Sequence, residues 1–245
     1  MTVIGITGPT GAGKTTALDV LAELGFEIVD CDALYYRLLQ TDEGLRRGLR
    51  EAFGEVFLPD GSLDRRAVAE RVFGDARELK KLNGVVFPAV SAAVEQKIRD
   101  CSQKGLAIDA INLVESGMGG LCDATVAVTA APAIRLKRIM VRDGLTEEQA
   151  RARIAAQKPA DWYRGKCTFL LENQEEDREA FEALMRSFFQ NLLEIYEKGE
   201  DDDGSEGMER EAAHEQEERL WPDACRGEGG DGPLLPGLQG VPGCR

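Results

Sequence analysis

The chain has 245 residues, a length that suits one domain with a well-formed hydrophobic core. It carries 44 acidic and 30 basic residues, a net charge of −14 at pH 7. Residues 199–245 hold 13 acidic and 4 basic residues, a net charge of −9, which leaves −5 for residues 1–198. The sequence has no basic stripe, which excludes a dedicated nucleic-acid binder, and no apolar run near the ~18 residues of a membrane span.

The cysteine and histidine content excludes further classes. The six cysteines form no C-x-x-C pair, and the one histidine is His214. A zinc centre and catalysis by a Cys–His or Ser–His pair are therefore disfavoured, and scattered thiols favour the reducing cytoplasm over a disulfide framework. We expect no membrane association, and the sequence indicates no obligate protein partner. The chemistry must use carboxylates, cations, backbone amides or a bound metal.

Apolar runs alternate with amphipathic segments from the first residue, which predicts an α/β fold with a mostly parallel sheet. We expect the longest helix to be interrupted at Pro88, because proline removes a hydrogen bond from a helix interior. The expected strands are 3–7, 26–29, 106–112 and 124–129, and the expected helices are 15–24, 33–40, 43–53, 65–73, 77–99, 134–142, 146–157 and 179–197.

The last part of the chain, residues 199–245, differs in composition from the rest. It contains 10 of the 27 glycines and 4 of the 9 prolines, together with most of the net negative charge. Such a segment cannot bury enough apolar surface to offset the entropy cost of ordering it, so we predict a disordered acidic tail. The alternative is a short helix around residues 209–220.

Residues 8–15, GPTGAGKT, match the pattern G-x-x-x-x-G-K-[ST] and lie between a predicted strand and a predicted helix. In this motif the glycines let backbone N–H groups approach phosphate oxygens, the lysine reaches the β- and γ-phosphates, and the hydroxyl binds Mg²⁺. The alternative is an ordinary glycine turn before a helix. We predict a nucleotide-phosphate site formed by Gly11, Ala12, Gly13, Lys14, Thr15 and Thr16, in which Lys14 also serves catalysis and Thr15 is the metal ligand.

Two carboxylates, Asp30 and Asp32, follow the second predicted strand, at the edge where open α/β sheets bind ligands. Residues of a strand alternate between its two faces, so both side chains are expected to project the same way. A carboxylate in this position can orient Mg²⁺ through water or accept a proton from a hydroxyl during phosphoryl transfer. The alternative is a pair of solvated carboxylates at a strand end.

Several segments, in this order, resemble the dephospho-CoA kinase family: GITGPTGAGKTT, IVDCD, FGEVFLPDGSLDR, VFGD, a Phe-Pro pair, LVES and RIMVRDGLTEEQARARIAAQ. The resemblance extends over about residues 3–198. It implies a kinase domain at 1–198 with a three-layer P-loop NTPase fold, a helical acceptor-binding region at about 33–100 and a lid at about 133–165. It also implies Mg²⁺-dependent transfer of the ATP γ-phosphate to the ribose 3′-hydroxyl of dephospho-CoA, the final step of coenzyme A synthesis.

The resemblance also assigns roles to individual residues. It makes Asp32 the candidate general base and places Asn173 near the nucleotide base, although Asn173 is equally suited to a turn or a helix cap. The acceptor site would be bordered by Asp32, Asp64, Arg65, Leu113 and Glu115.

Arginines are concentrated on two adjacent predicted helices of an otherwise acidic chain. Arg138 and Arg142 are four residues apart, so they share a helix face, and the family has an arginine at both positions. Their guanidinium groups suit the charge that grows on a transferring phosphate, and we predict both to be catalytic. The alternative is a solvated helix with ordinary ion pairs. The other arginines of the group are Arg135, Arg151 and Arg153.

The sequence departs from the family pattern at four places. Phe87 precedes Pro88 where the family has His-Pro, and residues 111–115 read INLVE instead of Pro-Leu-Leu-Phe-Glu. Arg135 replaces a frequent glutamine, and Thr168 replaces an aspartate. The first three departures concern acceptor recognition, whereas the phosphate-binding residues are retained.

Two other functions are compatible with the same motifs. One is another P-loop kinase that acts on a small molecule or a nucleoside monophosphate. The other is a nucleotide-dependent regulatory protein whose acidic tail recruits a partner. The D-x-D motif and the arginine-rich helices favour a kinase, because a switch protein needs neither.

Overall fold

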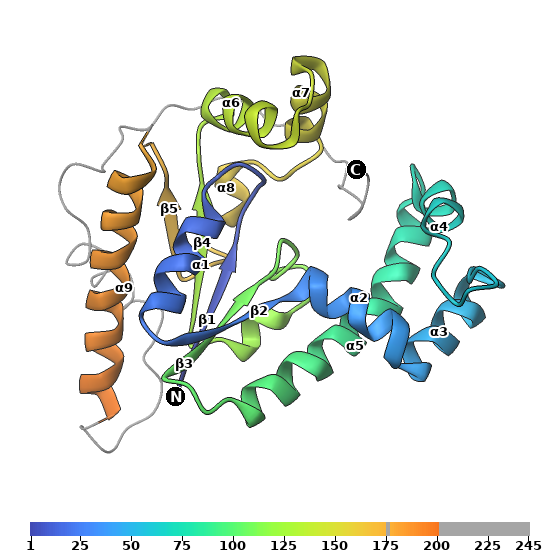
Figure 1. Cartoon of the computed structure of the whole chain (residues 1–245), viewed down its shortest axis with the longest axis horizontal. Coiled ribbons are helices and arrows are strands. Elements are labelled where there is room, and N and C mark those ends of the chain that lie inside the picture. The colour runs from blue at the N-terminus through green and yellow to red at the C-terminus, as the bar shows by residue number, and fades with distance from the viewer. Residues whose placement is uncertain (175–176, 201–245) are drawn as a thin grey trace.

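The computed structural model describes residues 1–174 and 177–200 (Figure 1). The predicted tail starts at residue 199. Its expected disorder, and the alternative helix at 209–220, therefore lie outside the described residues apart from the first two positions.

A five-stranded parallel sheet forms the centre of the fold, with the strand order β2-β3-β1-β4-β5. Asp30 at the end of β2 pairs in register with Asp109 at the end of β3. The alternation of strands and helices confirms the predicted α/β class. The strands are β1 (Thr2–Thr7), β2 (Phe26–Asp30), β3 (Gly105–Asp109), β4 (Ala124–Thr129) and β5 (Phe169–Glu172).

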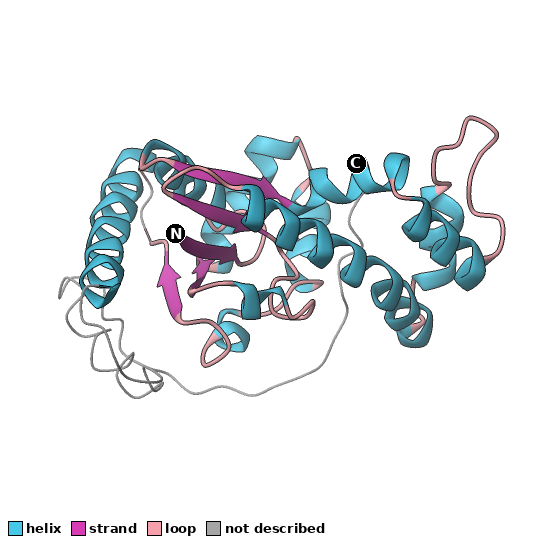
Figure 2. Ribbon diagram, turned by 90° about the horizontal axis from the view of Figure 1, so that it is seen from below, coloured by secondary structure: helices cyan, strands magenta, loops and turns pink. Residues whose placement is uncertain are grey.

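Helices cover both faces of the sheet because its strands are apolar on both sides. Helices α1 (Lys14–Glu23) and α9 (Arg178–Glu200) pack together on one face, against Ile4 and Ile6 of β1. The neighbouring residue Val3 points to the opposite face, as the period of two in a strand requires, and packs there with residues of α2 (Cys31–Thr41) and α5 (Ala76–Asp100). Figure 2 shows α9 and the extension formed by α2 to α5 on opposite sides of the sheet.

Four helices extend from the sheet after β2 and have an apolar cluster of their own, which includes Leu49, Phe53 and Val68. They form the right-hand part of Figure 1. The four helices are α2 (Cys31–Thr41), α3 (Glu43–Phe53), α4 (Arg65–Val72) and α5 (Ala76–Asp100).

The expected interruption at Pro88 is wrong, because α5 is continuous through the proline. The two halves of the helix are anchored in different apolar clusters: Leu82 packs with α3 and α4, while Val94 packs against the sheet. This packing on both sides of the proline offsets the backbone hydrogen bond that it removes.

Three further helices lie near the carboxyl edge of the sheet: α6 (Pro132–Asp143), α7 (Glu147–Ala155) and α8 (Ala160–Tyr163). Thr146, the first residue of the predicted helix 146–157, caps α7 in a reciprocal arrangement with Gln149. Figure 1 shows α6 and α7 at the top of the molecule, across a gap from α4.

The sequence did not predict β5 or α8, since a four-residue edge strand and a one-turn helix leave almost no periodicity to detect. The third strand is also shorter than expected, because the chain turns after Asp109 and Leu113 N–H closes on the Ala110 carbonyl at 3.3 Å. Within residues 1–174 and 177–200, no helix combines the length and the apolar character that crossing a membrane requires.

The close contact between β2 and β3 yields a stability prediction. Gly105→Ala should lower the free energy of unfolding by about 1–3 kcal/mol, because a Cβ there would overlap the Phe26 ring and lie 2.5 Å from the Thr2 carbonyl oxygen. The control is Gly84→Ala in α5, where a Cβ meets no atom within 4 Å. It should be neutral or stabilising by up to about 1 kcal/mol. Urea unfolding measures both, and equal effects would contradict the packing of this strand pair.

Candidate functional site: a phosphate pocket beside an apolar cavity

The loop that carries G-x-x-x-x-G-K-[ST] connects β1 to α1 at the carboxyl edge of the sheet. Strands β3 and β4 flank β1, so the chain reverses its winding direction here, and such a point is where open α/β sheets bind ligands. Gly13 starts α1 with φ 115°, a left-handed conformation, and a Cβ there would lie 2.5 Å from Asn173 Nδ2. Only glycine satisfies both conditions.

A pocket of about 300 Å³ lies above this loop. Its wall combines backbone of the loop with charged side chains from three other parts of the chain. Of the predicted phosphate-binding residues, Gly11, Gly13, Lys14 and Thr15 line the pocket, and Ala12 and Thr16 do not. The remaining wall residues are Thr10, Asp30, Asp32, Asp109, Ile111 and Arg142.

Lys14 is held close to the loop that precedes it. Its Nζ donates to the carbonyl oxygens of Gly8 at 2.8 Å and of Pro9 at 3.3 Å. Burial lowers the pKa of Lys14 to about 8, although the nearby Asp109 carboxylate opposes the shift. A phosphate in the pocket would favour the charged lysine, so the site gains electrostatically from an anionic ligand.

The expected strand-like arrangement of Asp30 and Asp32 is wrong. Asp30 is the N-cap of α2, and its Oδ1 accepts a hydrogen bond from the Ala33 N–H at 2.9 Å. The cap starts the helix at Cys31, which puts Asp32 in the first turn of α2 rather than in β2. Asp32 still reaches the phosphate pocket, and partial desolvation raises its pKa, with Asp30 adding to the shift.

A third carboxylate, Asp109, completes the acidic side of the pocket, and sequence reasoning missed it. Burial raises the pKa of Asp109 to about 6, and Asp30 and Asp32 add to the shift while Lys14 opposes it. Its position directly after the apolar run of β3 was a detectable indication, because the carboxyl ends of neighbouring parallel strands meet at one edge.

The predicted catalytic arginines occupy different places. Arg142 lines the phosphate pocket, and it forms an ion pair with Asp143 at 2.8 Å. Arg138 contacts the phosphate loop from outside: its Nη1 donates to the Gly11 and Ala12 carbonyl oxygens at 3.2 and 3.3 Å. The catalytic role of both stays a prediction.

The other three arginines of the group also lie in different places, one at the phosphate loop and two in ion pairs of α6 and α7. Arg135 is 5% exposed and contacts the phosphate loop, as described below. Arg151 forms an ion pair with Glu147, and Arg153 forms one with Asp143. For these two arginines the structure matches the alternative of a solvated helix with ordinary ion pairs.

Asn173 is buried against the phosphate loop. It follows β5, and its Nδ2 donates to the Ala12 carbonyl oxygen at 2.9 Å. Its Oδ1 accepts from Arg138 Nη2 at 3.4 Å. The structure therefore places Asn173 against the phosphate loop, and its predicted place near the nucleotide base stays a prediction.

A second cavity, of about 140 Å³, lies between α2, α4 and α5 and is mostly apolar. Three of the five predicted acceptor-site residues line it: Asp32, Arg65 and Glu115. The Arg65 guanidinium lies 4.2 Å from the centre of the Tyr36 ring. Phe87 also lines the cavity, where it offers an apolar surface and no hydrogen bond.

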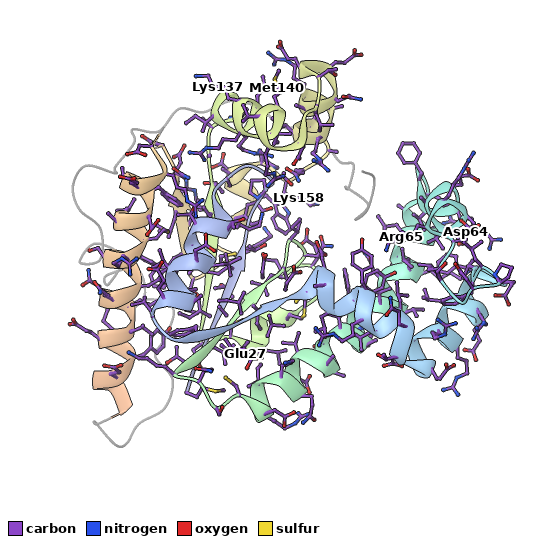
Figure 3. The ribbon with its side chains drawn as sticks, viewed as in Figure 1. Glu27, Asp64, Arg65, Lys137, Met140 and Lys158 are labelled. Atoms are coloured by element: carbon purple, nitrogen blue, oxygen red, sulfur yellow. The ribbon has the colours of Figure 1, made fainter. Side chains whose placement is uncertain are left out.

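The other two predicted acceptor-site residues do not line this cavity. Asp64 caps α4 by accepting from the Ala67 N–H at 2.9 Å, and Leu113 is fully buried beside Gly5. Figure 3 shows Arg65 on the side of the helical extension that faces the sheet, with Asp64 farther out and Lys158 across the gap.

The residues at the pocket fit a divalent cation that binds together with phosphates. Thr15, Asp32 and Asp109 offer only oxygen donors, the ligand type that Mg²⁺ prefers. Within the described part of the chain, no group of three or more His, Cys, Asp or Glu side chains could hold a metal by itself. Mg²⁺ commonly uses one or two protein oxygens, substrate phosphates and water, so this donor set suits it.

Comparisons with known proteins agree with this site. The family model for dephospho-CoA kinase matches residues 2–194. A protein from Dehalococcoides mccartyi named dephospho-CoA kinase is 40% identical over 161 residues, which cover 64% of this chain and 81% of the relative. Another with this name, from Moorella thermoacetica, is 34% identical over 197 residues, which cover 78% of this chain and 92% of the relative. The crystal structure of TT1252 from Thermus thermophilus matches with a TM-score of 0.65 and 34% identity, over 79% of this chain and 97% of that one.

The raised pKa of Asp109 predicts a pH-dependent stability for the ligand-free protein. Asp109 keeps its proton to about pH 6 when folded, but an unfolded aspartate loses it near pH 4. The stability from this protonated form is complete below pH ~4 and lost as the pH rises through ~6. Asp109→Asn should therefore raise the free energy of unfolding at pH 7 by about 1–3 kcal/mol, with less effect at pH 4.

Urea unfolding at the two pH values measures this difference. The control is Asp100→Asn, at the exposed end of α5, which should change neither value. An Asp109→Asn variant that is no more stable than the unmodified protein at pH 7 would contradict the electrostatic balance described here.

Proposed function

The chain belongs to the dephospho-CoA kinase family, which makes it an ATP-dependent phosphotransferase that acts on dephospho-CoA in coenzyme A synthesis, and we propose how its residues divide this work. The phosphate pocket takes the ATP phosphates, and the apolar cavity takes part of the acceptor. The γ-phosphate passes to the ribose 3′-hydroxyl where the two meet. The scattered cysteines of the sequence favour a reducing compartment, so we place the reaction in the cytoplasm.

One observation carries this division: Asp32 lines both the phosphate pocket and the apolar cavity. A carboxylate at the junction can orient a hydroxyl that enters from one side toward a phosphorus atom held on the other. The raised pKa of Asp32 brings its basicity closer to that of a useful general base. In this proposal Asp32 accepts the proton of the 3′-hydroxyl as the oxygen attacks.

The cationic side chains act on the donor phosphates. Lys14 leaves its contacts with the loop carbonyls and binds the β- and γ-phosphate oxygens. Arg142, at the pocket wall, and Arg138 stabilise the charge that spreads over the transferring group. Mg²⁺, when bound, supplies further neutralisation of the phosphate oxygens, and Thr15 would hold it, with Asp32 or Asp109 acting through water.

The helices around the two cavities hold the reactants together. We propose that α2 to α5 form the acceptor-binding region, at about residues 33–100, and that α6 to α8 form the lid, at about 133–165. The apolar cavity wall and the Arg65–Tyr36 stack suit a ligand with an apolar arm and a planar base. Closure of α6 to α8 over the junction would exclude water, which otherwise competes as the phosphoryl acceptor.

An acceptor assay tests the substrate assignment. Purified protein with MgATP should convert dephospho-CoA into coenzyme A, and AMP, shikimate or another small-molecule acceptor should release ADP at a far lower rate. Coupled ADP release and chromatography of the product measure both. ADP release that is fastest with another acceptor would identify a different small-molecule kinase. Slow ATP hydrolysis that no acceptor stimulates would favour the regulatory alternative.

Asp32→Asn tests the general base. We expect kcat to fall by roughly 10²–10⁴-fold, because the amide cannot accept the proton, and the dissociation constant for ATP to change little. Asp30→Asn is the matched control, since asparagine also caps a helix and this side chain is committed to the cap. Its kcat should fall by less than about tenfold. Comparable activity of Asp32→Asn and the unmodified protein would remove Asp32 as the base.

A further inference from the structure

Three residues, Thr10, Arg135 and Gln157, form a closed hydrogen-bonded ring at the phosphate loop. Arg135 Nε donates to the Thr10 carbonyl oxygen at 2.9 Å, and its Nη2 donates to Gln157 Oε1 at 2.5 Å. Gln157 in turn accepts from the Thr10 N–H at 3.1 Å and donates to the Thr10 hydroxyl at 2.7 Å. The N–H, the carbonyl and the hydroxyl of one loop residue are thus all held by residues of the lid segment.

The ring is partly buried, and its arginine is packed tightly against the loop. Arg135 is 5% exposed. A charged side chain is rarely buried to this extent unless it has a specific partner, and the ring supplies one. A Cβ on Gly11 would lie 3.2 Å from the Arg135 carbonyl oxygen and 3.3 Å from its Cα, so helix α6 packs against the bare backbone of the loop. Gly11 has φ +80°. The start of α6 and the loop therefore have little freedom to move relative to each other.

A carbonyl held on one side of a loop sets the direction of the next N–H group. The peptide group is planar and trans, so its C=O and N–H point in opposite directions. The Thr10 carbonyl points outward to Arg135, and the Gly11 N–H consequently points toward the pocket that Gly11 lines. The Ala12 N–H differs, because it closes a turn on the Pro9 carbonyl at 3.4 Å.

We propose that Arg135 and Gln157 are positioning residues for phosphate binding, which hold the Thr10–Gly11 peptide with its N–H directed at a bound nucleotide phosphate. Arg135 is not one of the residues that line the pocket; it acts through the loop backbone. The proposal rests on the proposed function, in that the anion is the phosphate chain of ATP or ADP.

Ligand binding separates positioning from simple charge attraction. Gln157→Ala opens the ring and leaves the net charge of the protein unchanged. Arg135→Lys keeps the positive charge but loses the two N–H donors that the guanidinium directs at Thr10 and Gln157. Both should weaken ADP binding by about five- to tenfold in calorimetric titrations with MgADP, since a lost hydrogen bond leaves the peptide free to turn. Binding of adenosine, which has no phosphate, should stay within twofold. In steady-state assays, KM for ATP should rise more than kcat falls.

The control is Arg164→Gln, an exposed arginine of the same segment that lies 3.7 Å from Asp161, and it should bind MgADP as the unmodified protein does. Thermal melting shows whether each variant is folded, and if Arg135→Lys does not fold, Gln157→Ala carries the test. Unchanged MgADP affinity of Gln157→Ala would overturn the proposal, as would an equal loss of adenosine affinity. A protein that binds MgADP as expected but does not phosphorylate dephospho-CoA would refute the proposed function and leave this inference standing.

Discussion

The phosphate loop depends on one constraint: side chains must hold its carbonyl oxygens so that an amide group such as that of Gly11 remains available to a ligand. Every carbonyl from Gly8 to Ala12 accepts a hydrogen bond from a side chain. Lys14 donates to the carbonyls of Gly8 and Pro9, and Arg135 donates to that of Thr10. Arg138 donates to the carbonyls of Gly11 and Ala12, and Asn173 also donates to that of Ala12. The donors come from α1, from α6 and from the segment after β5, so the shape of the loop requires most of the described fold to be in place.

Electrostatic balance is the second feature that connects the parts. Asp30, Asp32 and Asp109 meet at one sheet edge, and Lys14 and Arg142 stand against them in a partly desolvated pocket. The raised pKa of Asp109 and the lowered pKa of Lys14 show that neither charge is fully compensated in the ligand-free protein. Such a site is less stable than it could be and gains from a bound nucleotide and cation, a common trade between stability and function.

Local patterns predicted much of this arrangement, and they failed where distant contacts decide. The P-loop motif and the parallel α/β class were correct because each is indicated by patterns of neighbouring residues. The helix interruption expected at Pro88 was wrong, because packing of both halves of α5 outweighs one missing backbone hydrogen bond. Strand alternation was wrongly extended to Asp32, because the sequence alone does not show whether the chain continues as a strand or starts a helix capped by Asp30.

The sequence by itself determined that the chain binds a nucleotide phosphate, since glycines, a lysine and a hydroxyl at fixed spacing already specify the geometry of the loop. The net charge of −14 did not indicate this, because most of the net negative charge lies after residue 198. Only the tertiary structure decided that Asp109 joins the pocket, that Asp32 connects two cavities and that Arg135 holds the loop rather than the ligand. The physical reason is that these roles arise between residues up to 125 positions apart, where burial and hydrogen-bond direction are set by the packing of whole elements.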